Sequence, residues 1–310
     1  MSRSEGSLPV TASGSQPHAF TPLDWTLLAT AAVIWGSSFV FIAEGLEAFG
    51  PGLVTFLRIA FGAAALSVVP AARAPVPRAH RTRLLLLAVT WMAVPFLCFS
   101  LAEQWIASSL AGMLNGAMPI LTAVVASALL RRLPGPRQVA GVVIGCAGVV
   151  AVSVPALDHG DSGSWAGVGL VLVAVSCYAI AANVAVPLQQ TYGALPVLWR
   201  TQLFALGLTA PLGIAGVAGS SFAWSSALAV VALGVFGTGL AFVAATTLFG
   251  RVGATRGSVA VFFVPVVAIV AGAVFRDEEV ALLSIIGALL VLSGAALASR
   301  AEAPTPAPVD

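Results

Sequence analysis

The chain has 310 residues, of which 59% are hydrophobic and only 8% are charged, and its formal net charge is +2. A water-soluble domain carries about 25% charged residues, so this composition excludes a soluble globular protein. All 14 basic residues are arginines, which also excludes the lysine-containing phosphate loop of a nucleotide-driven pump.

Ten apolar segments follow a polar tail. Residues 1–23 are rich in Ser, Gly and Pro, which predicts a disordered cytoplasmic tail without a cleavable signal peptide. A membrane-crossing helix needs about 20 apolar residues. Such segments lie at residues 24–45, 51–71, 83–102, 107–130, 137–155, 165–186, 195–217, 225–248, 257–275 and 280–299, before a second cytoplasmic tail at 300–310. The sequence therefore predicts an all-α integral membrane protein with ten transmembrane helices.

The arginines between these segments predict the orientation, because cytoplasmic loops of membrane proteins are enriched in basic residues. With the N-terminus inside, one arginine lies outside, Arg276, and eleven lie in the cytoplasm: Arg3, Arg73, Arg78, Arg81, Arg83, Arg131, Arg132, Arg137, Arg251, Arg256 and Arg300. Both termini are therefore predicted to be cytoplasmic, with the protein in the cell membrane and the lipid bilayer around it.

Matching residues recur at a nearly constant spacing along the chain. Trp35 and Tyr178, Arg58 and Arg200, and Pro119 and Pro265 are pairs separated by 143, 142 and 146 positions. The spacing predicts two repeats, residues 24–155 and 164–299. Because each repeat has five helices, an odd number, the second must insert in the opposite orientation. The turns that follow the two proline helices fit this, with Arg131-Arg132 in one and Asp277-Glu278-Glu279 in the other.

The chain resembles the EamA-like ten-helix branch of the drug/metabolite transporter superfamily. The resemblance rests on Trp35-Gly36-Ser37-Ser38-Phe39, Arg58, the run Leu110–Pro119 with its partner at Pro265, and Gly287 with Gly294. It implies a secondary transporter that moves small amino-acid-like or drug-like metabolites by alternating access, usually outward, and closing helices that pack on each other within the chain. The family usually has an acidic residue before helices 5 and 10, but Arg131-Arg132 stands at the first of these places.

Polar residues inside a membrane are costly, so they indicate a cavity or a protein contact. Asn115 is the only amide in its segment, and Pro119 removes the helical hydrogen bond to the carbonyl of residue 115. These two residues predict the cavity, although Asn115 could instead bond a neighbouring helix. Ser37 lies on the polar stripe of the first segment. Trp35, with Tyr178 opposite, is a candidate aromatic wall for the substrate, and core packing is the alternative.

Arg58 lies about 10 Å from the outer end of its helix. It could bind a substrate carboxylate, pair with an acid in an outer gate, or extend to the membrane interface. Glu44 and Glu103 are the acids near span ends on that side, and we treat them as gate or coupling candidates, with plain surface exposure as the alternative.

The competing classes are an integral-membrane enzyme and a channel or receptor without transport activity. An enzyme needs His, Asp or Glu clustered at one depth, and the sequence has no such cluster or nucleophile motif. The three cysteines fall separately within apolar runs, as buried small side chains do. We expect no catalytic residues, cofactor, metal ion or nucleic acid, only a small-molecule substrate. The sequence leaves the substrate and the oligomeric state open.

Overall fold

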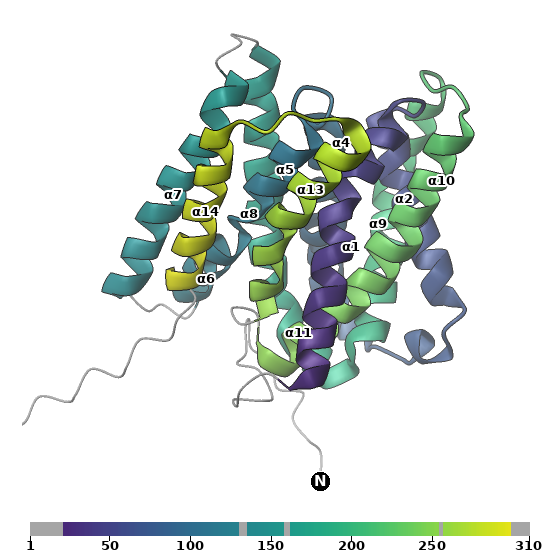
Figure 1. Cartoon of the computed structure of the whole chain (residues 1–310). Helices are drawn as coiled ribbons and strands as arrows, with labels where there is room; N and C mark the ends of the chain where they lie inside the picture. The colour runs from purple at the N-terminus through teal and green to yellow at the C-terminus, as the bar shows by residue number, and fades with distance from the viewer. Residues whose placement is uncertain (1–20, 130–134, 158–161, 254–256, 299–310) are drawn as a thin grey trace, which may run out of the picture.

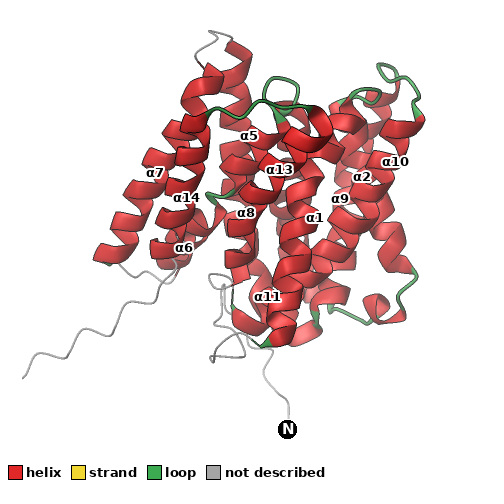
Figure 2. Ribbon diagram, in the orientation of Figure 1, coloured by secondary structure: helices red, strands yellow, loops and turns green. Residues whose placement is uncertain are grey.

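The computed structural model describes residues 21–129, 135–157, 162–253 and 257–298, and these are helical with short connections (Figure 2). Most of both tails, together with Arg131, Arg132 and Arg256, lies outside the described residues. The α-helices are α1 (Pro22–Leu46), α2 (Pro51–Ser67), α3 (Arg81–Leu87), α4 (Val94–Ala102), α5 (Ser108–Asn115), α6 (Met118–Leu129), α7 (Pro136–Leu157), α8 (Ser162–Tyr192), α9 (Ala194–Val217), α10 (Trp224–Ala232), α11 (Ala241–Val252), α13 (Val264–Arg276) and α14 (Leu282–Ala298). Short 3-10 segments, η1 (Pro70–Arg73), η2 (Arg78–His80) and η5 (Ser258–Phe263), connect some of them.

The surface pattern is that of a membrane protein. Five helical stretches are long and apolar enough to cross a membrane: Pro22–Leu46, Arg78–Ala102, Ser108–Leu129, Gly163–Tyr192 and Trp224–Val252. Four shorter apolar helices accompany them. Large apolar side chains such as Trp224, Phe275 and Ile214 are more than 70% exposed, as expected for a surface that faces lipid. Multiple membrane-spanning helices are therefore established, whereas the ten crossings and the side of the termini stay predictions.

Two of the predicted continuous helices are interrupted beside their prolines. The segment at 107–130 is divided into α5 and α6, and the break falls at Gly116 and Ala117, just before Pro119. The segment at 257–275 begins as the 3-10 turn η5 and becomes α-helical at Val264, with Pro265 in the first turn of α13. A proline cannot donate the backbone hydrogen bond of a helix interior, so each break lies where that bond is missing.

Two further segments are wound as π-helices, which the sequence does not predict. η3 (Ala88–Ala93) joins α3 to α4, and η4 (Leu233–Leu240) joins α10 to α11. Their first residues, 88 and 233, are 145 positions apart, within the spacing of the matching residue pairs. π-Helices are rare and concentrate at functional sites. Their occurrence at matching positions is therefore a backbone similarity between the two halves, additional to the matching side chains.

Helices α7 and α14 lie side by side at one edge of the molecule (Figure 1). Their backbones approach closely at glycines: a Cβ atom on Gly148 would lie 2.5 Å from the backbone nitrogen of Val291 and 2.7 Å from the carbonyl oxygen of Gly287. Small residues permit this kind of contact between membrane helices. The expected packing of the two closing helices within the chain is thus present.

The Gly148→Ala variant tests this contact. The added methyl group has no room, and overpacking of this kind costs about 1–3 kcal/mol. We expect the unfolding midpoint of the purified protein in detergent to fall by about 2–8 °C. Gly207→Ala in α9 is the matched control, because a Cβ atom there meets nothing within 4 Å. Equal midpoints for the two variants would contradict the close approach.

Candidate functional site

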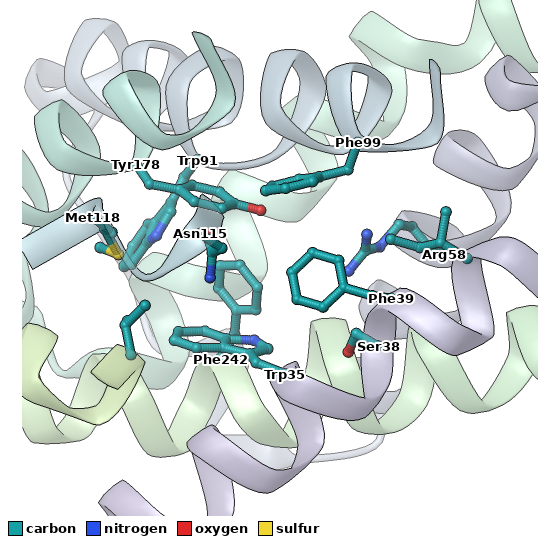
Figure 3. A pocket seen from close by; sticks show the side chains of 12 residues that line it. Trp35, Ser38, Phe39, Arg58, Trp91, Phe99, Asn115, Met118, Tyr178 and Phe242 are labelled. Carbon is teal, nitrogen blue, oxygen red and sulfur yellow. The ribbon is translucent and has the colours of Figure 1, made fainter. Parts of the chain in front are cut away.

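A cavity lies at the centre of the bundle, between the two halves of the chain (Figure 3). It has a volume of about 40 Å³ and is lined by Trp35, Ser38, Phe39, Ile42, Arg58, Trp91, Phe99, Asn115, Met118, Tyr178, Phe242 and Val261. One water molecule needs roughly 10–15 Å³ of such space, so the cavity has room for only a few waters. Four predicted site residues line it: Trp35, Arg58, Asn115 and Tyr178.

Arg58 brings a buried positive charge to this cavity. It lies on α2 and is 3% exposed. Its Nε donates a hydrogen bond of 3.2 Å to Oγ1 of Thr238, and its guanidinium carbon lies 3.6 Å from the ring centroid of Phe96. The two terminal nitrogens donate to no described residue, and no described carboxylate forms an ion pair with them. The predicted pairing of Arg58 with Glu44 or Glu103 is therefore absent from this structure, and its terminal N–H donors stay available to an anion.

The π-helix η4 holds the residues around Arg58. The backbone carbonyl of Gly237 accepts a hydrogen bond of 3.2 Å from Nε1 of Trp35, and that of Thr238 accepts one of 2.7 Å from Nε2 of Gln202. A π-helix has a different pattern of backbone hydrogen bonds from an α-helix. Some of its carbonyl oxygens can therefore accept hydrogen bonds from side chains of neighbouring helices. Sequence reasoning missed Thr238 and Gln202. The only signal for them is that both are polar residues inside apolar segments.

Asn115 lies at the break between α5 and α6. The sequence predicts a polar side chain and a missing helical hydrogen bond at this position. Asn115 is 5% exposed, and its Oδ1 is buried without a hydrogen-bond partner among the described residues. A buried amide oxygen without a partner is unfavourable by about 1–3 kcal/mol, unless a ligand donates to it. Pro119 does not line the cavity, but the residue before it, Met118, does. Pro119 therefore acts on the site through the break in the helix.

Aromatic rings form most of the remaining wall. Trp35 packs edge-on against Phe242 with 5.2 Å between ring centroids, and Phe99 lies 5.3 Å from Phe39 and 6.0 Å from Tyr178. Figure 3 shows these rings around the Asn115 side chain, with Arg58 to one side.

The serine that lines the cavity differs from the predicted one. Ser37 is half-buried and does not line the cavity, whereas the next residue, Ser38, does. One position along a helix is a rotation of about 100°, which is enough to turn a side chain from one neighbour to another. The hydroxyl of Ser38 donates to the carbonyl of Ile34 at 2.7 Å, so it offers an acceptor to the cavity.

Charged contacts between the two halves close the end of the bundle that is predicted to face outward. Arg276, at the end of α13, pairs with Glu44 at 3.3 Å and with Glu47 at 2.8 Å, both at the end of α1. Glu278 accepts hydrogen bonds from the backbone nitrogens of Ser108 and Ser109 at 3.0 and 2.9 Å and from the Ser108 hydroxyl at 2.7 Å. It thus caps the first turn of α5. We call these contacts the outer latch.

The pKa of Glu278 shows that the capping carboxylate is stable as an anion. Burial alone opposes ionisation, but the hydrogen bonds from Ser109 and Ser108 outweigh it and hold the pKa below its ordinary value. A carboxylate whose pKa is lowered by folding contributes stability above its unfolded pKa and loses it only as pH falls through the lowered value. The cap that Glu278 forms on α5 therefore persists at mildly acidic pH.

Glu103, at the end of α4, is the second predicted gate residue. Both of its carboxylate oxygens are buried and have no hydrogen-bond partner among the described residues. Burial and the negative charge of Glu278 raise its pKa well above the ordinary value, while Arg58 and Arg276 act in the opposite direction. The surroundings of Glu103 therefore favour its protonated form.

The Glu103→Gln variant should remove a pH dependence of stability. A carboxyl whose pKa is raised by folding stabilises the fold below its unfolded pKa, and that stability is lost as pH rises through the raised value. As pH rises above the ordinary pKa of a glutamate, we therefore expect the unfolding midpoint of the unsubstituted protein to fall, and that of the variant to fall less. Glu279→Gln, at an exposed position, is the control. Parallel curves for all three proteins would contradict the buried carboxyl.

A second ion pair closes the opposite end of the bundle. Asp24, in the first turn of α1, is 1% exposed in its side chain and accepts a hydrogen bond of 2.6 Å from Nε of Arg251 in α11. The Thr21 hydroxyl donates to the same carboxylate at 2.7 Å. We call this pair the inner latch. Helix α1 is thus tied at both ends to the second half of the chain, with the cavity between the ties.

Comparisons with known proteins agree on one protein family. A model of the EamA-like transporter family matches residues 25–154 and again 165–300. The chain is 24% identical over 275 residues to an uncharacterized transporter of Archaeoglobus fulgidus, covering 87% of this chain and 96% of that protein. It is 25% identical over 287 residues to a probable terminal-alkyne amino-acid exporter of Streptantibioticus cattleyicolor, covering 89% and 93%. A solved crystal structure aligns with a TM-score of 0.59 at 20% identity, over 89% of this chain and 96% of that chain, which shows a shared fold.

Proposed function

Because the chain belongs to the EamA-like transporter family, we propose that it is a secondary transporter that exports a small amino-acid-like metabolite across the cell membrane by alternating access. One observation carries the proposal above the others. A small central cavity lies between two latches, and each latch joins the first half of the chain to the second. Alternating access requires one latch to open while the other stays closed.

The proposed architecture is ten transmembrane helices in two inverted repeats, with both termini in the cytoplasm. Two features support it besides the arginine distribution. The family model matches once in each half of the chain, and the π-helices η3 and η4 occupy equivalent places in the two halves. In this arrangement the outer latch faces the exterior and the inner latch faces the cytoplasm.

The chemistry of the cavity supports a cargo with a carboxylate and a hydrogen-bond donor. The terminal N–H groups of Arg58 can donate to a carboxylate in a bidentate manner. The free Oδ1 of Asn115 can accept from an amine or ammonium group. Trp35, Tyr178 and the neighbouring rings can hold an apolar body and the face of an ammonium. An amino acid has these parts, and one relative bears the name of an amino-acid exporter.

The cavity must enlarge before it can hold such a cargo, since its present volume of about 40 Å³ has room for only a few waters. Release of the outer latch would separate the ends of α1 and α5 from α13. We propose that Glu44, through its pair with Arg276, and Glu103, through its protonation, set how readily this end opens. In an exporter driven by a proton gradient, Glu103 would be the buried carboxyl that takes up a proton from outside.

Transport measurements in oriented vesicles test the function. A panel of amino acids and other small metabolites is presented to right-side-out and inverted vesicles, with and without a proton gradient. We expect at least one carboxylate-bearing solute to move, with accumulation in inverted vesicles when their lumen is acidic. The Asn115→Ala and Trp35→Ala variants should weaken its apparent affinity. Movement of no solute would contradict the function, and normal transport by both variants would remove these residues from the site.

A further inference from the structure

A second concave site lies away from the central cavity, where the segment between α2 and α3 meets α9. This segment is at the lower right of Figure 1. The groove has a volume of about 440 Å³, and its lining includes Arg78, Arg81 and Arg200 beside Leu203 and Phe204. It therefore combines three positive charges with an apolar wall. The arginine distribution predicts that it lies at the cytoplasmic membrane interface.

Specific contacts hold the groove in shape. The guanidinium of Arg200 donates to the carbonyl oxygens of Pro196, Ala72 and Arg73 at 3.3–3.4 Å, which ties α9 to η1. Arg73 in turn donates to the carbonyl of Ser67 at 2.6 Å, at the end of α2. These bonds fix the floor of the groove, with Arg200 in it.

The side of the groove that carries Arg78 and Arg81 is also tied to the bundle. His80, in η2 between these two arginines, lies 2.8 Å from the hydroxyl of Tyr192 at the end of α8. The interaction joins the short η2 segment to a long helix. Arg78 and Arg81 thus extend from an anchored turn, although their side chains are exposed.

The three arginines have no acidic counter-charge in the surrounding elements. The groove is built by α2, η1, η2, α3 and α9, with the end of α8 beside it. Residues 48–102 and 162–276, which include all of these elements, contain no Asp or Glu. No ion pair among the described residues involves Arg78, Arg81 or Arg200. The concentration of uncompensated charge favours an anionic ligand.

The apolar wall indicates what else the ligand must contain. Leu203, Leu208 and Leu212 of α9 are each 42% exposed, and Ile214 is 73% exposed. Leu203 lines the groove, and Ile214, eleven residues further along α9, lies within about 20° of it around the helix axis. A free inorganic anion would gain nothing from such a surface, whereas an acyl chain would lie along it.

We propose that this groove binds an anionic phospholipid, with the headgroup phosphate at Arg78, Arg81 and Arg200 and an acyl chain along α9. Basic pockets between helices on the cytoplasmic side of membrane proteins recognise such headgroups. Arginine suits the role because its planar donors match phosphate oxygens. The site is independent of the central cavity and of the cargo.

Native mass spectrometry of the purified full-length protein tests the site, with phosphatidylglycerol and phosphatidylcholine of identical acyl chains as probes. We expect phosphatidylglycerol to bind more tightly. The R78Q/R81Q variant should lose about 25-fold in this binding, because each arginine near an anionic lipid contributes about fivefold. R83Q/R137Q is the control, since it removes the same charge on the same predicted side but outside the groove lining. The single variant R81Q, at an exposed position, should lose about fivefold in phosphatidylglycerol binding. It tests the same site if the double variant does not fold.

Each other outcome overturns the proposal. Equal loss in the groove and control variants would indicate general surface charge. Equal retention of the two lipids would indicate an apolar groove only, and full displacement by millimolar inorganic phosphate would indicate an anion site without a lipid. Because no measurement involves transport, these outcomes are separate from the failure of the transport function.

Discussion

Replacing Arg58 with glutamine should lower the transport of a carboxylate-bearing cargo about 10- to 100-fold, while the protein still folds. Hydrogen bonds to a charged group contribute about 1.5–3 kcal/mol each, and glutamine offers the cargo no charge and fewer donors. The loss should be large because the cation is 3% exposed and water cannot readily replace it. Initial rates of uptake into inverted vesicles, at cargo concentrations below half-saturation, measure the effect.

Two comparisons separate binding from folding in this experiment. Arg58→Lys keeps the charge but not the planar fork, so its rate should lie between those of the glutamine variant and the unsubstituted protein. Arg83→Gln makes the same chemical change on α3, outside the cavity lining, and should leave transport within about threefold.

A comparison of two cargoes decides whether Arg58 binds the carboxylate. An amide analogue of the cargo lacks the carboxylate, so the unsubstituted protein should transport it poorly and Arg58→Gln should hardly change its rate. If the variant lowers the rates of the acid and the amide by the same factor, Arg58 supports the fold of the cavity and does not bind the carboxylate.

Sequence reasoning located Arg58, Asn115, Trp35 and Tyr178 because a polar or large aromatic residue deep in an apolar helix stands out. The cost of burying polar groups in lipid makes such positions informative. Sequence reasoning did not locate Thr238, whose hydroxyl accepts a hydrogen bond from Arg58 and whose carbonyl accepts one from Gln202. That arrangement depends on a π-helix, and π-helices have no sequence pattern comparable to an apolar period.

The two predicted gate residues show the same contrast between what the sequence indicates and what it does not. Glu44 and Glu103 were predicted from their position near the outer ends of helices, and the structure places Glu44 in an ion pair and buries the carboxylate of Glu103. Their neighbours Arg276 and Glu278 are more than 170 residues away along the chain in every case. A single sequence indicates which side of the membrane such residues share, but not which of them touch.

The capping of α5 by Glu278 leads to the second large expected effect. Glu278→Gln should shift the protein toward an outward-open state by about 100-fold. The carboxylate accepts three hydrogen bonds from Ser108 and Ser109 and faces the positive end of a helix. The neutral amide keeps one acceptor oxygen, and its NH₂ group faces N–H donors. Loss of about 3 kcal/mol from the closed state corresponds to that shift.

Labelling from outside measures this shift. A single cysteine replaces Ile42, which is 1% exposed and lines the cavity, in a chain whose Cys98, Cys146 and Cys177 are alanine. A membrane-impermeant maleimide should then react faster in the Glu278→Gln variant than in its parent. Glu279→Gln is the control, because it removes the neighbouring charge at an exposed position.

A second substitution reaches the same latch from the other side. A Cβ atom on Gly272 would lie 2.5 Å from Oε2 of Glu278, so Gly272→Ala should displace the carboxylate from α5 and also speed labelling. Faster labelling in both variants, with the control unchanged, can only arise if the outer end opens where Glu278 meets α5. Unchanged labelling in both would mean that the pairs of Arg276 with Glu44 and Glu47 hold this end closed by themselves. Among the described residues the outer latch comprises two ion pairs and a helix cap, so opening this end requires several contacts to break together. In the proposed exporter, these contacts would keep the outer end closed while the cargo enters the cavity from the cytoplasm.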